Sequence, residues 1–173
     1  MSSKHKNLSL YNPSTMPEAA GFRFGIVVAE WNDAITNSLY EGCYQTLLDN
    51  KAIPENIKTV QVPGAFELVA AAAMLVKSNP NIDAIIVLGC VIKGETSHNE
   101  YINMSVAQGL QQLAMFHNRA FVFGLLTPND QQQAIDRAGG TLGNKGIEAA
   151  QTAIRMAAIR NNLLNAAKNK IGF

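Results

Sequence analysis

The segment VIKGETSHNEY, residues 91–101, ends an apolar run with groups that can bind an anion and move protons. Ser97 and Glu100 have the spacing of a capping box, which predicts that a helix begins at this point. The free backbone N–H groups of that helix, with those of the turn at residues 94–96, would form an anion site suited to a phosphate. His98 lies beside it on the first turn, and an imidazole readily gives and accepts protons near neutral pH. The alternative is an ordinary capped helix that carries a solvated histidine.

Two cations flank a glycine-rich break further along the chain. Arg137 precedes and Lys145 follows the segment AGGTLGN, whose glycines permit a tight turn that brings both cations toward one point. A phosphate held by backbone N–H groups often also recruits a guanidinium, because a guanidinium binds it bidentately. We therefore expect Arg137 to complete the anion site. A solvated helix face is the alternative for both residues.

Aromatic side chains lie where the expected strands end. Trp31, the single tryptophan, follows the first strand, and Phe66 and Phe123 lie at the ends of two others. Aromatic faces at the rim of a sheet suit a planar heterocycle, whose hydroxyl or amino groups Asn32 and Glu67 could bind. Core packing is the alternative for the aromatic residues. For Glu67 we expect burial beside an apolar helix, which is costly unless the carboxylate has a partner.

The elements that position these residues follow from the hydrophobic pattern, which changes its period along the chain. Apolar runs of strand length are followed four times by segments with helical periodicity. Parallel strands need crossovers, and helices supply them here, so we expect an α/β fold with a four-stranded parallel sheet covered on both faces. Ligands bind at the carboxyl ends of such strands. The expected strands are 22–30, 57–62, 82–92 and 120–127, and the expected helices are 34–50, 66–79, 100–118, 129–140, with Pro128 at its start, and 147–167.

Length and charge exclude several classes of protein. A chain of 173 residues with a net charge of +1 fits a single domain, expected at residues 22–173, without the basic excess that nucleic-acid binding requires. Its apolar runs are too short to cross a membrane. Residues 1–21 form a flexible arm without the apolar stretch of a signal peptide, so we expect a cytoplasmic protein.

The cysteines and histidines do not predict a metal site. Cys43 and Cys90 are far apart and lie among apolar neighbours, which is typical of reduced core thiols. His5 lies in the arm and His117 at a helix end, neither with a second ligand at a useful spacing. We expect no bound metal.

Six blocks of sequence resemble, in the same order, the 6,7-dimethyl-8-ribityllumazine synthase family. The resemblance implies a flavodoxin-like three-layer αβα sandwich and a transferase of riboflavin biosynthesis that uses no cofactor. Such an enzyme joins 5-amino-6-(D-ribitylamino)uracil to 3,4-dihydroxy-2-butanone 4-phosphate and releases phosphate and water. The blocks lie between about residues 21 and 161 and read GIVVAEWN, VPGAFE, LGCVIKGETSH, FGLLT, AIDRAG and GNKGIEAA.

The resemblance implies a role for each of the distinctive residues. Contacts with the pyrimidine and its ribityl chain are expected from Trp31, Asn32, Ala65, Phe66, Glu67, Cys90, Val91, Ile92 and Phe123. Contacts with the phosphate of the second substrate are expected from Glu95, Thr96 and Arg137. His98 is the expected proton-transfer residue, and Lys145 and Glu148 are expected close to the reacting groups.

Two departures from the family pattern concern the phosphate. Thr141 stands near the position where many relatives carry a further lysine, so this site is expected to be less cationic. Glu95 places a carboxylate beside the phosphate, which is tolerable only if its side chain points away and its backbone alone binds.

The resemblance also implies assembly. Family members form pentamers with active sites between adjacent subunits, Phe123 coming from the neighbour, and the arm adds a strand to the neighbour's sheet. The compact GNKG turn favours a shell of twelve pentamers, with a single pentamer and a decamer as alternatives, while Pro13 would disturb the pairing of the arm. Enclosed riboflavin synthase is a further partner that the resemblance leaves open.

Two other functions compete with the enzyme. A carrier or shell protein that binds flavin or lumazine without turnover would need the same aromatic rim, but not His98 and the phosphate site together. A flavin electron-transfer protein is disfavoured, because the loop WNDAITN lacks the hydroxyl-rich phosphate cradle that such proteins place there.

Overall fold

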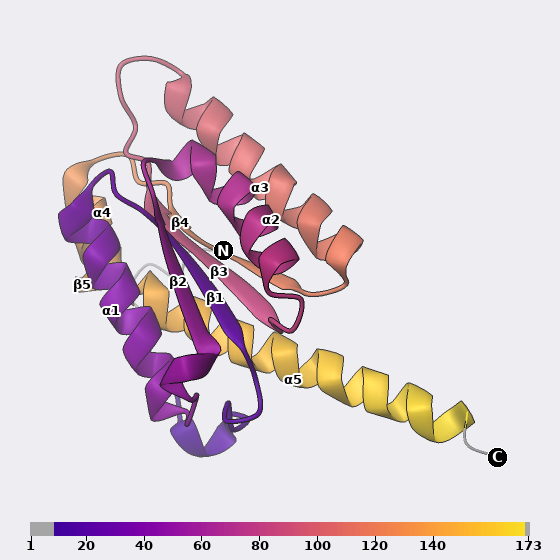
Figure 1. The fold of residues 1–173 in the computed structure, drawn as a ribbon. Coiled ribbons are helices and arrows are strands. Elements are labelled where there is room, and N and C mark those ends of the chain that lie inside the picture. Colours follow the sequence, from indigo (N-terminus) through magenta and orange to yellow (C-terminus); the bar gives the residue numbers. More distant parts are fainter. Residues whose placement is uncertain (1–8, 172–173) are drawn as a thin grey trace.

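The computed structural model describes residues 9–171 and contains the expected parallel sheet (Figure 1). Its strand order is β2-β1-β3-β4, and each neighbouring pair is parallel. The predicted α/β fold with a four-stranded parallel sheet is therefore confirmed. The strands are β1 (Phe24–Ala29), β2 (Ile57–Val62), β3 (Ala84–Cys90) and β4 (Ala120–Leu126).

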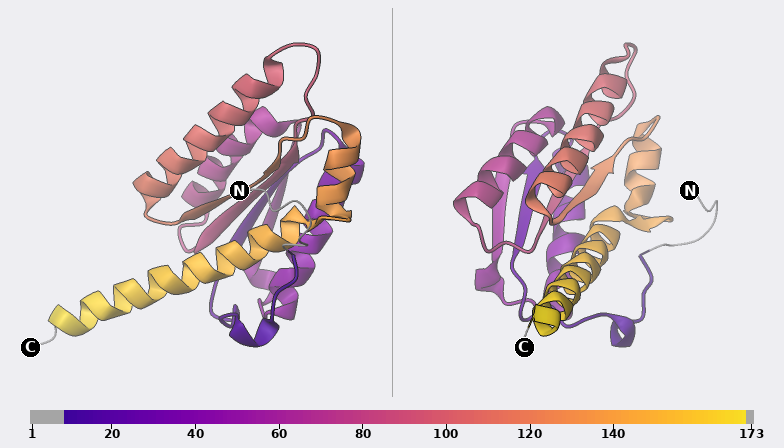
Figure 2. Two further views of the ribbon diagram at one scale, coloured as in Figure 1. Left: turned by 180° about the vertical axis from the view of Figure 1, so that it is seen from behind. Right: turned by 90° about the vertical axis from the view of Figure 1, so that its right-hand side faces the viewer.

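Helices cover both faces of the sheet and form the outer two of three layers (Figure 2). One apolar core joins α1 and α5 to the sheet, and a second core joins α2 and α3 to its other face. Every residue of β1 and β3 is buried, as expected for central strands of a parallel sheet. The helices are α1 (Asp33–Asp49), α2 (Leu68–Ser78), α3 (His98–His117), α4 (Gln131–Arg137) and α5 (Lys145–Ile171).

The last helix is longer than the sheet that it covers. With 27 residues α5 spans about 40 Å at 1.5 Å per residue. Its buried positions end at Ala157, and the remaining turns extend past the sheet (Figures 1 and 2). Core packing therefore fixes only the first half of α5.

The glycine-rich break forms a small hairpin that the sequence pattern did not predict. Its strands, β5 (Ala138–Gly140) and β6 (Gly143–Asn144), pair antiparallel. Gly139 and Gly143 have φ values of 119° and 86°, a backbone region that favours glycine. The segment was expected to be a turn, and the hairpin is a more ordered version of it.

Three short 3-10 turns, η1 (Pro13–Thr15), η2 (Pro54–Asn56) and η3 (Ala65–Glu67), complete the architecture. The η3 turn carries the first residues of the expected second helix, so α2 begins only at Leu68. Pro128 was also wrongly placed at a helix start. The N-cap of α4 is Asp130, whose side chain accepts a hydrogen bond of 2.8 Å from the backbone N–H of Gln133.

The described part of the arm packs against its own chain. Met16 and Ala19 are buried in the core beside α1 and α5. The Ser9 hydroxyl donates a 3.1 Å hydrogen bond to the backbone oxygen of Asn144. Residues 9–21 contain no strand. The beginning of the arm, including His5, lies outside the described residues, so the boundary at residue 21 and the strand added to a neighbour stay predictions.

Candidate active site

A cavity of about 760 Å³ opens at the carboxyl ends of β1, β2 and β3. This volume lies within the range of small-molecule sites, and the position is the one expected for a ligand of a parallel α/β sheet. The segments that follow these strands and the first turns of α3 supply the lining. It consists of Trp31, Asn32, Gly64, Ala65, Phe66, Glu67, Cys90, Val91, Ile92, His98, Tyr101 and Ile102.

Aromatic side chains stand at the mouth of this cavity instead of packing in the core. Trp31 is 74% exposed and Phe66 is 63% exposed. Glu67 is exposed as well, so the expectation that its carboxylate is buried was wrong. It is carried on the η3 turn ahead of α2, which leaves it at the rim. Core packing does not account for these three side chains.

Gly64 allows the side chains of Trp31 and Glu67 to come close to each other. A Cβ atom added at this residue would lie 3.1 Å from Oε2 of Glu67 and 3.5 Å from Cδ1 of Trp31. Both side chains therefore occupy the space that a larger residue would fill. The indole and the carboxylate flank the same point of the cavity wall.

The amide of Asn32 is held by the protein itself. Its Nδ2 donates a 2.9 Å hydrogen bond to the backbone oxygen of Cys90, and the residue caps α1 in a left-handed conformation with φ of 61°. This bond ties the loop after β1 to the end of β3. The Asn32 side chain therefore stabilises the cavity wall. Its Oδ1 accepts no hydrogen bond from the described residues.

The backbone beyond β3 has free groups at the cavity. The N–H of Val91 donates to the backbone oxygen of Leu126 at 2.9 Å, and that of Lys93 donates to Pro128 at 3.0 Å. Between them, the N–H of Ile92 makes no hydrogen bond within the described part of the chain. Backbone contacts from this segment are therefore available from Ile92 and from the oxygen of Val91.

His98 begins α3 and lines the cavity, directly after a turn whose backbone donors are free. Across the described residues, no hydrogen bond is formed by the N–H groups of residues 94–99. Ser97 occupies the N-cap position as predicted, but its side chain makes no capping bond, so the capping box is not closed. Glu95 and Thr96 are exposed in this turn and do not line the cavity. The start of α3 thus presents unsatisfied donors and a partial positive charge.

A second group of expected site residues lies elsewhere, at the outer edge of β4. Phe123, Lys145 and Glu148 line a cavity of about 350 Å³ between α3, β4 and α5. Nζ of Lys145 and Oε2 of Glu148 form an ion pair of 2.8 Å. Within one chain these residues are not brought to the cavity that holds His98.

Arg137 lies in neither cavity. It is half-buried, and no ion pair to it is found in the described chain. The hairpin pairs Ala138 with Asn144, so the backbones of Arg137 and Lys145 lie next to each other just beyond that pair. The glycine-rich break therefore brings the backbones of these two residues together, and the expected convergence of their charged groups on one phosphate stays a prediction.

Tyr101 and Ile102 were missed by the sequence reading. Both line the larger cavity from α3, and Tyr101 is 75% exposed. The available signal was helical spacing, because a residue three positions after His98 lies on the same helix face.

The two thiols are buried, as predicted for core cysteines. Burial raises the pKa of Cys90 to about 11, and it raises the pKa of Cys43 still further. Both thiols are therefore protonated at neutral pH. Although Cys90 lines the cavity, its thiol is therefore a weak nucleophile at neutral pH.

The described residues contain neither a cluster of metal ligands nor a helix that could span a membrane. No three side chains of His, Cys, Asp or Glu gather in residues 9–171 to hold a metal ion. No helix in that range is both long enough and apolar enough to cross a bilayer.

Comparison with known proteins identifies the family. Residues 21–161 match the family model of 6,7-dimethyl-8-ribityllumazine synthase. Proteins with that name from Flavobacterium johnsoniae and Parabacteroides distasonis are 48% and 47% identical over 92% and 90% of this chain, covering 84% and 97% of their own lengths. One from Bacteroides fragilis is 51% identical over 78% of this chain and 93% of its own. The chain belongs to the 6,7-dimethyl-8-ribityllumazine synthase family.

Membership of the lumazine synthase family confirms the resemblance and the enzyme class predicted from sequence. The chain is a transferase of riboflavin biosynthesis, and nothing favours the non-catalytic carrier. The parallel sheet agrees with the flavodoxin-like fold of lumazine synthases. The role of each residue in the two groups stays a prediction.

Proposed function

We propose that the larger cavity condenses 5-amino-6-(D-ribitylamino)uracil with 3,4-dihydroxy-2-butanone 4-phosphate to give 6,7-dimethyl-8-ribityllumazine. The observation that carries this proposal is the meeting of Trp31, His98 and the free N–H groups of residues 94–99 at one rim. An exposed indole suits the flat pyrimidine. The free N–H groups at the start of α3 suit the phosphate.

The reaction depends more on holding the two substrates in the right positions than on activating either of them. The amine of the pyrimidine attacks the butanone carbonyl and gives an imine with loss of water. Elimination of phosphate then leaves a second carbonyl, which the second nitrogen attacks with loss of another water to close the ring. Two substrates held in register react as if they were one molecule, which is the larger part of the rate gain. His98 moves a proton in these steps, a contribution of about 10²-fold or less for such a reactive amine. No step requires a metal or an organic cofactor.

Two subunits complete the site in this proposal. Phe123, Lys145 and Glu148 line one edge of the chain, whereas Trp31 and His98 line the cavity at the strand ends. β4 is an edge strand, and Phe123 on it is 36% exposed. A neighbouring copy that docks its β4 edge on the larger cavity would supply Phe123 and, through the hairpin, Arg137 for the phosphate. Glu95 then contacts phosphate through its backbone only, as does Thr96.

Mixing the two substrates with the purified protein tests the reaction. We expect the fluorescence of lumazine to appear with release of phosphate. Substitution Arg137→Gln is expected to raise the KM for the phosphate substrate, because it removes the guanidinium. Binding of lumazine without turnover of the substrates would favour the carrier and overturn the proposal.

The assembly and location follow the family in this proposal. Pentamers that close into a shell of twelve, in the cytoplasm, fit a site shared between neighbours, and riboflavin synthase could be enclosed. Sedimentation of the native protein tests the shell. A mass of about five chains would leave the shared site intact and overturn the shell.

A further inference from the structure

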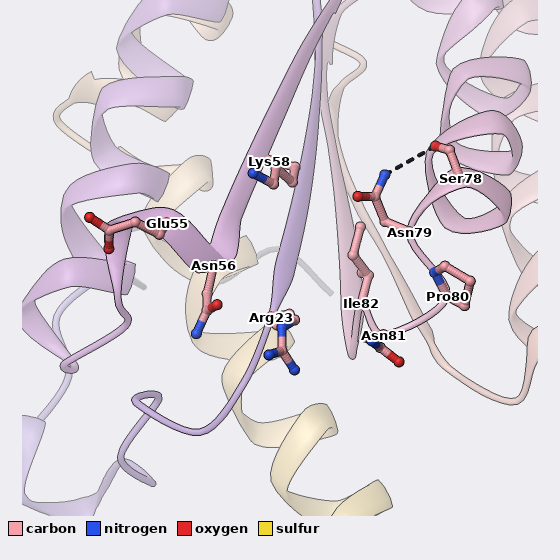
Figure 3. A pocket seen from close by; sticks show the side chains of 9 residues that line it. All are labelled: Arg23, Glu55, Asn56, Lys58, Ser78, Asn79, Pro80, Asn81 and Ile82. Atoms are coloured by element: carbon pink, nitrogen blue, oxygen red, sulfur yellow. Dashed lines mark hydrogen bonds between the residues drawn. The ribbon is translucent and has the colours of Figure 1, made fainter.

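A third cavity, of about 270 Å³, lies at the opposite end of the strands from the larger cavity (Figure 3). Three of its walls are segments that lead into strands. Arg23 precedes β1, Asn56 precedes β2 and Asn81 lies ahead of β3. Lys58 projects from β2, and the end of α2 closes the remaining side.

The charges of this cavity are not balanced within the chain. Among the described residues, the Arg23 guanidinium and the Lys58 ammonium form neither an ion pair nor a hydrogen bond. Glu55 is the one carboxylate of the lining, and Figure 3 shows it directed away from both cations. Asp83 lies nearby, but its carboxylate accepts the backbone N–H of Arg23 at 2.9 Å and pairs with Arg160. Two cations therefore face the cavity without a partner.

The end of α2 adds partial negative charge to one side of this cavity. The last carbonyl groups of a helix carry partial negative charge. The backbone oxygens of Met74 and Leu75, however, accept hydrogen bonds of 2.9 and 3.2 Å from the hydroxyl of Ser78. Leu75 also accepts one of 3.2 Å from the Asn79 amide. These bonds satisfy the carbonyl groups of Met74 and Leu75 only. Within the described residues the last three of the helix, those of Val76, Lys77 and Ser78, accept no hydrogen bond, so the charges of Arg23 and Lys58 must outweigh them.

We propose that this cavity is a separate anion site that holds the phosphate group of a small ligand between Arg23 and Lys58. A guanidinium binds phosphate in a bidentate manner, and an ammonium adds a point charge. The amides of Asn56 and Asn81 supply neutral donors. The volume is slightly below that of sites for drug-sized ligands, so it suits a free phosphate or a short phosphate ester.

The site is distinct from the phosphate site proposed at the start of α3. β1 has six residues, so about 20 Å of strand at 3.3 Å per residue separates the two rims. One phosphate cannot contact both. The two sites are therefore expected to bind phosphate independently, and the inference does not depend on the reaction.

Equilibrium dialysis of the full-length protein against radioactive inorganic phosphate tests this inference. We expect two binding sites per chain. The double variant Arg23→Gln/Lys58→Gln is expected to weaken one of them tenfold or more and to leave the other unchanged, and Arg137→Gln is expected to do the reverse. Lys77→Gln is the matched control, because this lysine lies on the last turn of α2 but outside the cavity. Competition by glycerol 3-phosphate then distinguishes the ester from the free ion.

The outcomes separate the two proposals. Binding that is lost only in the Arg23/Lys58 variant supports the inference, even if no site responds to Arg137→Gln and the phosphate site at α3 fails. Tighter binding of the ester than of inorganic phosphate identifies a phosphorylated metabolite as the ligand class, and equal binding identifies the ion. Unchanged phosphate binding in the double variant, or no binding beyond a site that Arg137→Gln removes, would overturn the inference.

Discussion

At the scale of single residues, the candidate site combines the imidazole of His98 with a cavity wall in which Gly64 leaves room for two larger side chains. His98 lies at the start of α3, where the backbone donors are free, and it lines the same cavity as Trp31. Gly64 leaves room for Trp31 and Glu67 to share one point of the wall. In the proposed mechanism His98 transfers a proton and Gly64 shapes the binding wall, so the two roles can be tested separately.

Replacement of His98 by alanine is expected to slow the reaction by about 10²-fold or less while leaving measurable turnover. The reason is that placement of the two substrates supplies most of the acceleration. Steady-state kinetics by lumazine fluorescence provide the measurement. His117→Ala, at the other end of the same helix, is the control and is expected to leave the rate unchanged. Complete loss of activity in His98→Ala with substrate binding intact would contradict this division.

Replacement of Gly64 by alanine is expected to raise the KM for the pyrimidine substrate several-fold with little change in kcat or Tm. The new Cβ would lie 3.1 Å from Glu67 Oε2, so the carboxylate must shift. The backbone itself tolerates alanine, because φ of Gly64 is −149°. Gly21→Ala is the control, since nothing lies within 4 Å of its added Cβ. An unchanged KM would show that Glu67 does not contact the substrate.

At the scale of elements, the approach of α1 to α5 depends on one close backbone contact. A Cβ atom at Gly146 would lie 1.9 Å from the backbone oxygen of Leu39. Next to this contact, Nδ2 of Asn144 donates a 2.9 Å hydrogen bond to the backbone oxygen of Ser38. Its Oδ1 accepts one of 2.8 Å from the N–H of Gly146. The hairpin and the first turn of α5 are thereby fixed against α1.

Substitution Gly146→Ala is therefore expected to lower the free energy of unfolding by about 3 kcal/mol or more, because a main-chain atom must move to accept the methyl group. Denaturant unfolding against wild type measures the change, with Gly21→Ala again as the control. The hairpin carries Arg137 and Lys145, so the KM for the phosphate substrate is expected to rise in parallel. Wild-type stability would show that α1 and α5 separate easily.

The buried thiols make the stability of these packed elements sensitive to alkaline pH. Burial raises the pKa of Cys90 in β3 to about 11 and that of Cys43 in α1 further. Above about pH 9 the unfolded chain loses thiol protons that the folded chain retains, so the free energy of unfolding falls as pH rises toward 11. Cys43→Ala/Cys90→Ala removes this contribution. Between pH 8 and 11 the double variant is expected to lose less free energy of unfolding than wild type, as measured by denaturant unfolding at each pH. An equal loss in both proteins would show that the two thiols do not cause the pH dependence.

At the scale of the whole molecule, one chain presents two incomplete groups of site residues on different surfaces. His98 and Trp31 belong to the larger cavity, and Phe123 with Lys145 belongs to the β4 edge. If neighbouring copies join the two groups, a substitution in one group and a substitution in the other group damage different halves of a shared site. Mixed assemblies can then regain intact sites that neither variant forms alone.

Co-expression of His98→Ala with Phe123→Ala is expected to restore activity that exceeds the mean of the two variants. In a random mixture about one site in four receives both intact halves, because each half is intact with even probability. Turnover per chain in the purified mixed assembly is the measurement. Separately expressed proteins, mixed under conditions that prevent subunit exchange, are the control. No recovery in the mixed assembly would place both residues in the same subunit's site.

Much of the fold was predictable because it rests on local pattern. The continuous apolar runs of β1 and β3 indicated strands buried on both faces, and the structure has them there. The capping bond of Ser97, the start of α4 and the burial of Glu67 were predicted wrongly. The start of α4 is set by the local capping bond of Asp130. The loop before α3 is instead held by a distant segment, through the bond from Lys93 to Pro128.

The sequence by itself determined the family, through its six blocks of motif, and the order of strands and helices along the chain, because apolar periodicity and chain order fix a parallel α/β sheet. Only the tertiary structure decided that the distinctive residues form two groups on different surfaces, that Tyr101 joins the first group, and that Arg23 and Lys58 face one cavity. The physical reason is that side-chain contacts across loops depend on the twist and spacing of strands far apart in the sequence, which no local pattern encodes.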